Sequence, residues 1–260
     1  MRFLLILLFS ASACSCEKPL VINYGPYVSL LVVDQFLGVF HQSLAEKTGC
    51  KVSYQLHKDY DDYLLSLFRK ETALALTPGT YYDVMVQRGY KLVASESRNK
   101  KRQIHVIAKK KSAINTLKDL ESHKVAIISS LSLSGSYFKG ELDKLGLLPS
   151  VELHFNPAYE SMVLSVMKGE LDAAVVIQEY WNALDPNLRE NHLKIIKTFM
   201  VEPDATFYVL KEFAHLSPII KEELTKTIID WDEPYEKAVG PDLLKSLLQS
   251  RLDQFMRDNQ

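Results

Sequence analysis

Residues 124–136, with the sequence KVAIISSLSLSGS, are the sharpest local feature of the chain. The apolar first part of this stretch predicts a short strand, and the small hydroxyl residues that follow lead into a predicted helix. N–H groups at a helix start attract anions, Ser132 and Ser134 can add hydroxyl donors, and Gly135 permits close backbone approach. The stretch therefore predicts a cradle for an oxyanion. On spacing alone, capping of the helix by Ser132 or Ser134 explains the same residues slightly better.

Strands and helices alternate on both sides of this stretch. Before it, strands are predicted at 21–24, 50–56, 73–76 and 91–95, with helices at 28–47, 60–70 and 80–88. After a polar stretch, the alternation resumes at 104–108, 117–121, 124–129, 135–145, 151–155, 159–168 and 171–177. Another polar stretch, 185–192, precedes strands at 193–199 and 206–210 and a helical tail. This βαβ alternation predicts parallel sheets with helices packed on them.

Two α/β blocks followed by a tail suggest that a second lobe is inserted between the halves of the first. We expect residues 17–102 to form the first part of lobe 1 and residues 103–199 to form lobe 2. Residues 200–260 then return to lobe 1 and add the C-terminal helices. The fold class is α/β. We expect a ligand-binding cleft between the lobes, with strand ends and helix starts as its walls.

The first 16 residues are expected to be an export signal with a lipidation motif. Arg2 precedes an apolar run at 3–9, and small residues at 10–13 precede Cys14. Cys14 fits the lipidated position better than Cys16, and a conventionally secreted chain is the alternative. The run is too short to span a membrane. Because Cys50 stands alone in the body of the chain, we expect neither a disulfide framework nor a thiol metal site.

Composition argues against several other classes of protein. The 260 residues carry 31 basic and 32 acidic side chains, so no global basic field favours nucleic acid. We interpret the basic runs at 99–102 and 109–111 as solvated turns. The seven histidines are scattered, so no metal site is predicted, and no cofactor-binding or hydrolase motif occurs.

Several segments resemble, in order, those of one known family. They are 59–63 (DYDDY), 77–81 (TPGTY), 112–120 (SAINTLKDL), the serine loop around Ser132, and 168–175 (KGELDAAV). The chain resembles the PhnD-like phosphate, phosphite and phosphonate-binding proteins of ABC transporters from about residue 20 to 210. This resemblance implies the type II periplasmic-binding-protein fold, two α/β lobes joined by hinge strands near 103–108 and 195–209, which close over a ligand.

The same resemblance implies a set of binding residues. Ser132, the backbone N–H of Leu133, and Ser134 would be oxyanion donors. Tyr60 and Tyr81 would add hydroxyls from the opposite lobe, and Tyr159 stands where relatives tend to have a histidine. Two positions depart from the family pattern: Leu133 replaces a typical threonine, and Thr72 replaces a typical aspartate of the first lobe.

Strand ends offer further candidates, because ligands in open α/β sheets bind beyond the carboxyl ends of strands. Tyr24 and Tyr27 flank the turn after the first strand, and both are candidates for the cleft, with burial against a helix as the alternative. Gln178 and Glu179 follow the strand at 171–177 and are candidates to bind an amine or hydroxyl, although turn residues are commonly polar for other reasons.

The sequence thus predicts a periplasmic lipoprotein that captures a small anionic, phosphate- or phosphonate-like ligand for an ABC permease. We expect a monomer without a cofactor, held on the inner or outer membrane only through its lipid. An adaptor that senses the ligand for a membrane signalling protein is the alternative. An enzyme is a third possibility, but the sequence offers no convergent set of histidine and carboxylate groups.

Overall fold

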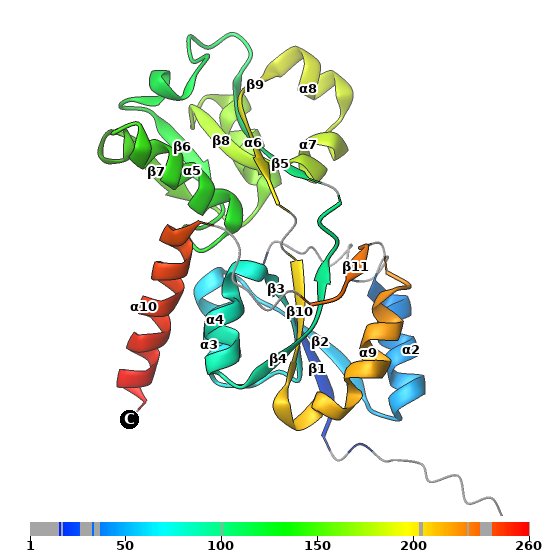
Figure 1. The fold of residues 1–260 in the computed structure, drawn as a ribbon. Helices are drawn as coiled ribbons and strands as arrows, with labels where there is room; N and C mark the ends of the chain where they lie inside the picture. Colours follow the sequence, from blue (N-terminus) through cyan, green and yellow to red (C-terminus); the bar gives the residue numbers. More distant parts are fainter. Residues whose placement is uncertain are drawn as a thin grey trace, which may run out of the picture.

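In the computed structural model, strands and helices build two sheet-centred lobes (Figure 1). The structure describes residues 16, 18–26, 33, 37–99, 101–202, 205–227, 229–234 and 241–259. The candidates Cys14 and Tyr27, and the predicted signal segment before Cys16, lie outside these residues. Among the described residues, no helix has the length and apolar character needed to cross a bilayer.

The first lobe is built on a six-stranded sheet whose strands occur in the order β11-β4-β10-β3-β1-β2. β1, β2 and β3 are mutually parallel, and β10 pairs antiparallel with both β3 and β4. The sheet is therefore mixed rather than wholly parallel. Its strands are β1 (Leu20–Tyr24), β2 (Val52–Leu56), β3 (Leu74–Pro78), β4 (Tyr90–Glu96), β10 (Ala205–Leu210) and β11 (Trp231–Asp232).

Helices cover this sheet, and the last of them also reaches the second lobe. They are α2 (Gly38–Thr48), α3 (Tyr60–Phe68), η2 (Gly79–Tyr81), α4 (Tyr82–Gln87), η5 (Lys211–Leu216), α9 (Ser217–Leu224) and α10 (Asp242–Asp258). The α10 helix, red in Figure 1, contacts α3, η2 and α4 of the first lobe and α5 of the second.

The second lobe is built on a five-stranded sheet in the order β7-β6-β8-β5-β9. Its strands are β5 (Arg102–Lys109), β6 (Lys124–Ile127), β7 (Glu152–Phe155), β8 (Ala173–Ile177) and β9 (Leu193–Val201). Its helices are η3 (Leu117–Leu120), α5 (Leu133–Lys144), η4 (Leu148–Ser150), α6 (Tyr159–Lys168), α7 (Gln178–Ala183) and α8 (Pro186–His192). Part of the stretch at 185–192, interpreted as an irregular polar connection, is thus a helix.

The chain passes between the two sheets twice, after β4 and after β9. β5 and β9 pair antiparallel, with Arg102 opposite Val201 at the end where both strands meet the first lobe. One hydrophobic cluster fills the first lobe and continues onto one face of the second sheet through α6, and a second cluster lies under α5. Apolar packing therefore joins the lobes, and the candidate binding cavity lies where they meet.

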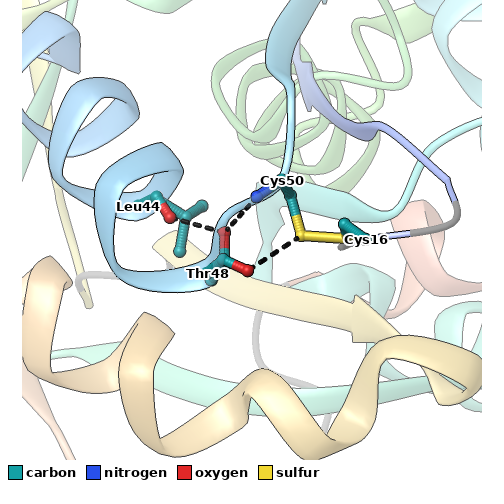
Figure 2. Close-up of a disulfide and its surroundings, with 4 residues drawn as sticks. All are labelled: Cys16, Leu44, Thr48 and Cys50. Atoms are coloured by element: carbon teal, nitrogen blue, oxygen red, sulfur yellow. Dashed lines mark hydrogen bonds between the residues drawn. A yellow bond between two sulfur atoms is a disulfide. The ribbon is translucent and has the colours of Figure 1, made fainter. Parts of the chain in front are cut away.

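Contrary to the expectation from the sequence, Cys50 forms a disulfide with Cys16 (Figure 2). The two Cα atoms lie 4.8 Å apart, although 34 positions separate the residues along the chain. Thr48 organises the turn that holds Cys50: its hydroxyl donates to the Leu44 carbonyl over 2.6 Å and accepts from the Cys50 N–H over 3.2 Å. Cys16 lies at the end of the expected export segment, which is why a partner for Cys50 was not expected.

Candidate functional site

The serine loop connects β6 to α5, and Ser132 caps that helix. The Ser132 hydroxyl accepts from the Gly135 N–H over 3.0 Å and donates to the Ser129 carbonyl over 2.7 Å. The capping role weighed from the sequence is therefore present. Because the hydroxyl proton of Ser132 is directed to Ser129, a ligand would have to compete with that carbonyl for it.

Gly135 has no room for a side chain. A Cβ atom added there would lie 2.0 Å from the Ser129 carbonyl oxygen, a distance that no packed carbon tolerates. The loop can fold back over the first turn of α5 only because this position lacks a Cβ. Gly135 thus sets the backbone path of the whole loop.

The amides of Leu133 and Ser134 are the first two of α5. N–H groups at the first positions of a helix have no carbonyl before them within that helix, and they carry its partial positive charge. Both residues line an interlobe cavity. The Ser134 hydroxyl lies 3.4 Å from that of Ser132, and it also hydrogen-bonds Tyr159. The first turn of α5 therefore forms part of the cavity wall, with Leu133 and Ser134 as its lining residues.

Tyr159 begins α6 and forms another part of the wall. Burial raises the pKa of its hydroxyl well above the ordinary value, an effect that a hydrogen bond with Ser134 only partly offsets. The Tyr159 ring stacks on Tyr180 with centroids 5.1 Å apart. Tyr159 therefore remains a neutral donor at any physiological pH.

The cavity lies between the two lobes and is small. Its volume is about 100 Å³, against roughly 15 Å³ that one water requires by the same measure, so it suits a ligand of a few heavy atoms. Residues of both lobes and of the strands joining them line it: Tyr60, Pro78, Arg102, Gln103, Ile104, Ser132, Leu133, Ser134, Tyr159, Ile177, Glu179, Val201 and Ala205.

Six of the residues that the sequence offered as candidates line this cavity: Tyr60, Ser132, Leu133, Ser134, Tyr159 and Glu179. Tyr24 is fully buried and does not line it. Tyr81 is fully buried, and its hydroxyl donates to the Leu131 carbonyl of the other lobe over 3.1 Å. Gln178 is the first residue of α7, and its two neighbours, Ile177 and Glu179, line the cavity while Gln178 does not. Binding by any of these residues stays a prediction.

Arg102 is a charged residue of the cavity wall that was not predicted from the sequence. Its guanidinium contacts Glu96 of the first lobe over 2.7 and 3.0 Å, and it lies 3.6 Å from Glu179 of the second. Interpreted as part of a solvated basic turn, it instead begins the strand that links the lobes. The available signal was its place immediately before that predicted strand.

The charged residues that line the cavity are Arg102 and Glu179, and Arg102 is also held by Glu96 outside the lining. The Glu179 side chain keeps about half of its surface exposed (51%), so a positive group is favoured beside it. An anionic group is favoured at the start of α5, because the first N–H groups of a helix carry a partial positive charge. Among the described residues, no group of three or more histidine, cysteine or acidic side chains is arranged to hold a metal ion.

The family of ABC transporter phosphonate periplasmic substrate-binding proteins matches residues 26–256 of the chain. The chain belongs to this family. A search of curated protein sequences found no match. The resemblance noted in the serine loop and the segments around it is thereby confirmed.

Solved structures of similar fold include proteins that bind phosphonates or serve phosphonate transport. PhnD1 of Prochlorococcus marinus in complex with methylphosphonate superposes with a TM-score of 0.68 at 15% identity, over 92% of this chain and 98% of that one. A Xanthomonas citri protein bound to ATP gives 0.63 at 14% identity, over 93% and 99%. A binding protein of a Pseudomonas aeruginosa phosphonate ABC transporter gives 0.62 at 15% identity, over 93% and 99%.

At these identities the likeness establishes the fold alone, and it confirms the predicted type II periplasmic-binding-protein architecture. The family itself is one of periplasmic proteins that serve transport. Ligands as different as methylphosphonate and ATP occupy the neighbours. The ligand of the present phosphonate-binding family member must therefore be argued from its own cavity.

Proposed function

We propose that this chain captures a small phosphonate-like oxyanion in the periplasm and delivers it, as a monomer, to an ABC permease. The observation that carries the proposal is the start of α5, where Leu133 and Ser134 line a cavity between the lobes. An oxyanion there gains charge-assisted hydrogen bonds and the helix dipole without a lysine or arginine. Binding rather than catalysis is the proposed role, and no cofactor is required.

Each wall of the cavity has a part in this proposal. The Leu133 and Ser134 amides and the Ser134 hydroxyl donate to the anion, and the Tyr159 hydroxyl supports Ser134. Tyr60 faces them from the first lobe. Because donors come from one lobe and the covering wall from the other, a bound anion favours the closed arrangement over an open one.

Glu179 narrows the proposed ligand class. A carboxylate that shares Arg102 with Glu96 would repel a simple dianion, whereas it stabilises a ligand that also bears an ammonium group. We therefore expect an aminoalkylphosphonate to bind more tightly than an alkylphosphonate of the same size. The ammonium group would lie at Glu179 and the phosphonate at α5.

The proposal includes a lipid anchor at Cys14. A lipidated cysteine carries its lipid through a thioether, and a sulfur already in a disulfide has no thiol to offer. The Cys16–Cys50 disulfide therefore favours Cys14 over Cys16. A disulfide also requires an oxidising compartment, which supports export.

Isothermal titration of the purified protein with phosphate, phosphite, methylphosphonate and 2-aminoethylphosphonate tests the ligand. We expect 2-aminoethylphosphonate to bind tightest, and Ser134→Ala to weaken its binding by about tenfold or more, because a donor to a charged group is lost. Ser136→Ala is the matched control, since that buried hydroxyl donates to the Leu133 carbonyl within α5. Absence of binding to all four compounds would refute the proposed ligand class.

A further inference from the structure

The Cys16–Cys50 disulfide lies at the opposite end of the first sheet from the cavity. Cys50 lies two residues before the start of β2. At the start of β1, the Leu20 N–H donates to the Lys51 carbonyl over 2.8 Å. The cavity instead lies beyond the carboxyl ends of these strands, where Tyr60 follows β2 and Pro78 ends β3. In Figure 1, β1 enters the sheet at the end remote from the second lobe.

The disulfide shortens the connection between Cys14 and the folded body. Cys14 and Cys16 are two positions apart, which a fully extended chain spans in at most ~7 Å. Without the disulfide, the first residue held by the sheet is Leu20, six positions from Cys14, and the same chain reaches ~20 Å. One covalent bond therefore changes a loose tether into a short one.

The fold does not need the disulfide to hold β1 in place. β1 lies between β3 and β2, and Leu20, Ile22 and Tyr24 are fully buried in the core. Breaking the disulfide is therefore expected to release the six-residue tether while the sheet stays paired. The side chains beside it, Lys18 and Lys51, are exposed and suit the polar surface of a bilayer.

We propose that the Cys16–Cys50 disulfide clamps the amino-terminal edge of the first sheet, defined by Cys16, Cys50 and Lys51, against the bilayer that holds the lipid. The cavity at the opposite end of the strands then faces away from the membrane. This inference rests on the proposed lipid anchor at Cys14. It concerns how the body is oriented, which lipid attachment by itself does not fix.

The test uses the full-length lipoprotein, purified from membranes and placed in phosphatidylcholine vesicles that carry a headgroup nitroxide quencher. A small fluorescent amino acid replaces either Lys51, beside the disulfide, or Lys118, an exposed residue of the second lobe. We expect strong quenching at position 51 and weak quenching at position 118. Equal quenching at both positions in the oxidised protein would overturn the proposed orientation.

Two variants separate the clamp from the lipid. A six-residue Gly-Ser insertion between Ser15 and Cys16 keeps the disulfide and lengthens the tether, and the Cys16→Ser/Cys50→Ser double variant removes the disulfide. We expect each to lower the quenching at position 51 to the level measured at 118. Unchanged quenching with the insertion refutes the clamp even if the double variant fails to fold.

Intact-mass spectrometry of the same samples distinguishes the two proposals. If the mature chain begins at Cys14 with lipid attached and quenching is equal at positions 51 and 118, only the clamp is refuted. A mature chain without lipid refutes the proposed anchor, and the clamp with it. Ligand binding measured in the same vesicles is expected to be unchanged by the insertion, because the cavity lies at the far end of the strands.

Discussion

At the scale of single residues, Gly135 shows how one missing side chain shapes the cradle. Gly135 lies in the first turn of α5, where its N–H donates to the Ser132 hydroxyl. The Ser129 carbonyl of the preceding loop occupies the space where a Cβ atom of residue 135 would lie. Gly140, seven residues from the start of the same helix, has open space where its Cβ would be. A Cβ atom would therefore clash at Gly135, whereas α5 has room for one at Gly140.

We expect Gly135→Ala to weaken ligand binding by about tenfold or more, because the loop must move away from the new Cβ and the Leu133 and Ser134 amides move with it. Gly140→Ala should leave binding unchanged and raise stability by roughly 0.5–1 kcal/mol, as alanine favours a helix interior. Titration calorimetry and thermal melting of both variants check this. Equal binding by the two variants would contradict the role given to Gly135.

At the scale of elements, a charged cluster joins α2 to α9. Glu223 of α9 has no exposed surface, and its carboxylate accepts from Lys226 over 2.7 Å and lies 2.6 Å from the Lys47 nitrogen of α2. Burial alone would raise the pKa of Glu223, but hydrogen bonds from Lys226, Lys47 and Ser43 outweigh it and lower the pKa to about 2. The cluster therefore stabilises the folded state only while Glu223 is ionised.

We expect Glu223→Gln to lower the free energy of unfolding at pH 7 by roughly 1–2 kcal/mol, less than for a fully buried pair because both lysines are partly exposed. The folded pKa lies below the unfolded value of ~4.3, so this contribution is complete above that value and is lost as the pH falls through about 2. Urea unfolding between pH 7 and pH 2 should show the difference between the two proteins shrinking.

Glu222→Gln is the matched control for that experiment. Glu222 also contacts Lys47, but its side chain is largely exposed (63%). Its removal is expected to change stability by a few tenths of a kcal/mol at most, at every pH. A wild-type advantage over Glu223→Gln that stays constant down to pH 2 would contradict the assignment of the acid-sensitive group.

At the scale of the whole molecule, Tyr81 links the two lobes. It sits in η2 of the first lobe, and its buried hydroxyl donates to the Leu131 carbonyl in the loop before α5. Tyr63 makes a similar bond within the first lobe, to the Leu76 carbonyl over 2.9 Å. Only the first of these bonds has to break when the lobes separate.

We expect Tyr81→Phe to favour the open arrangement and to weaken ligand binding by about 2- to 10-fold, the equivalent of one net hydrogen bond of roughly 0.5–1.5 kcal/mol. Tyr63→Phe should lower stability by a similar amount without changing affinity. Small-angle scattering of the ligand-free variants, together with titration calorimetry, checks both statements. An affinity loss equal in the two variants would show that Tyr81 acts through stability alone.

Local patterns in the sequence were enough to predict much of the fold and part of the candidate site. Alternating strands and helices predicted two α/β lobes, and the type II fold is confirmed. The Ser132–Gly135 segment predicted a helix start at a strand end, where the structure has it. The helix at 186–192 was missed although Asp185 and Pro186 are its ordinary start signals, with the Asp185 side chain accepting from the Asn187 and Leu188 amides.

Pairings between distant segments could not be predicted from the sequence. β10 lies antiparallel between β3 and β4. Arg102 contacts both Glu96 and Glu179. The Tyr81 hydroxyl donates to the Leu131 carbonyl. Propensity and periodicity act over a few neighbouring residues, whereas these contacts depend on how whole elements pack. Sequence patterns were therefore enough to locate most strands and helices, to within a few residues, and packing determined which of their side chains meet.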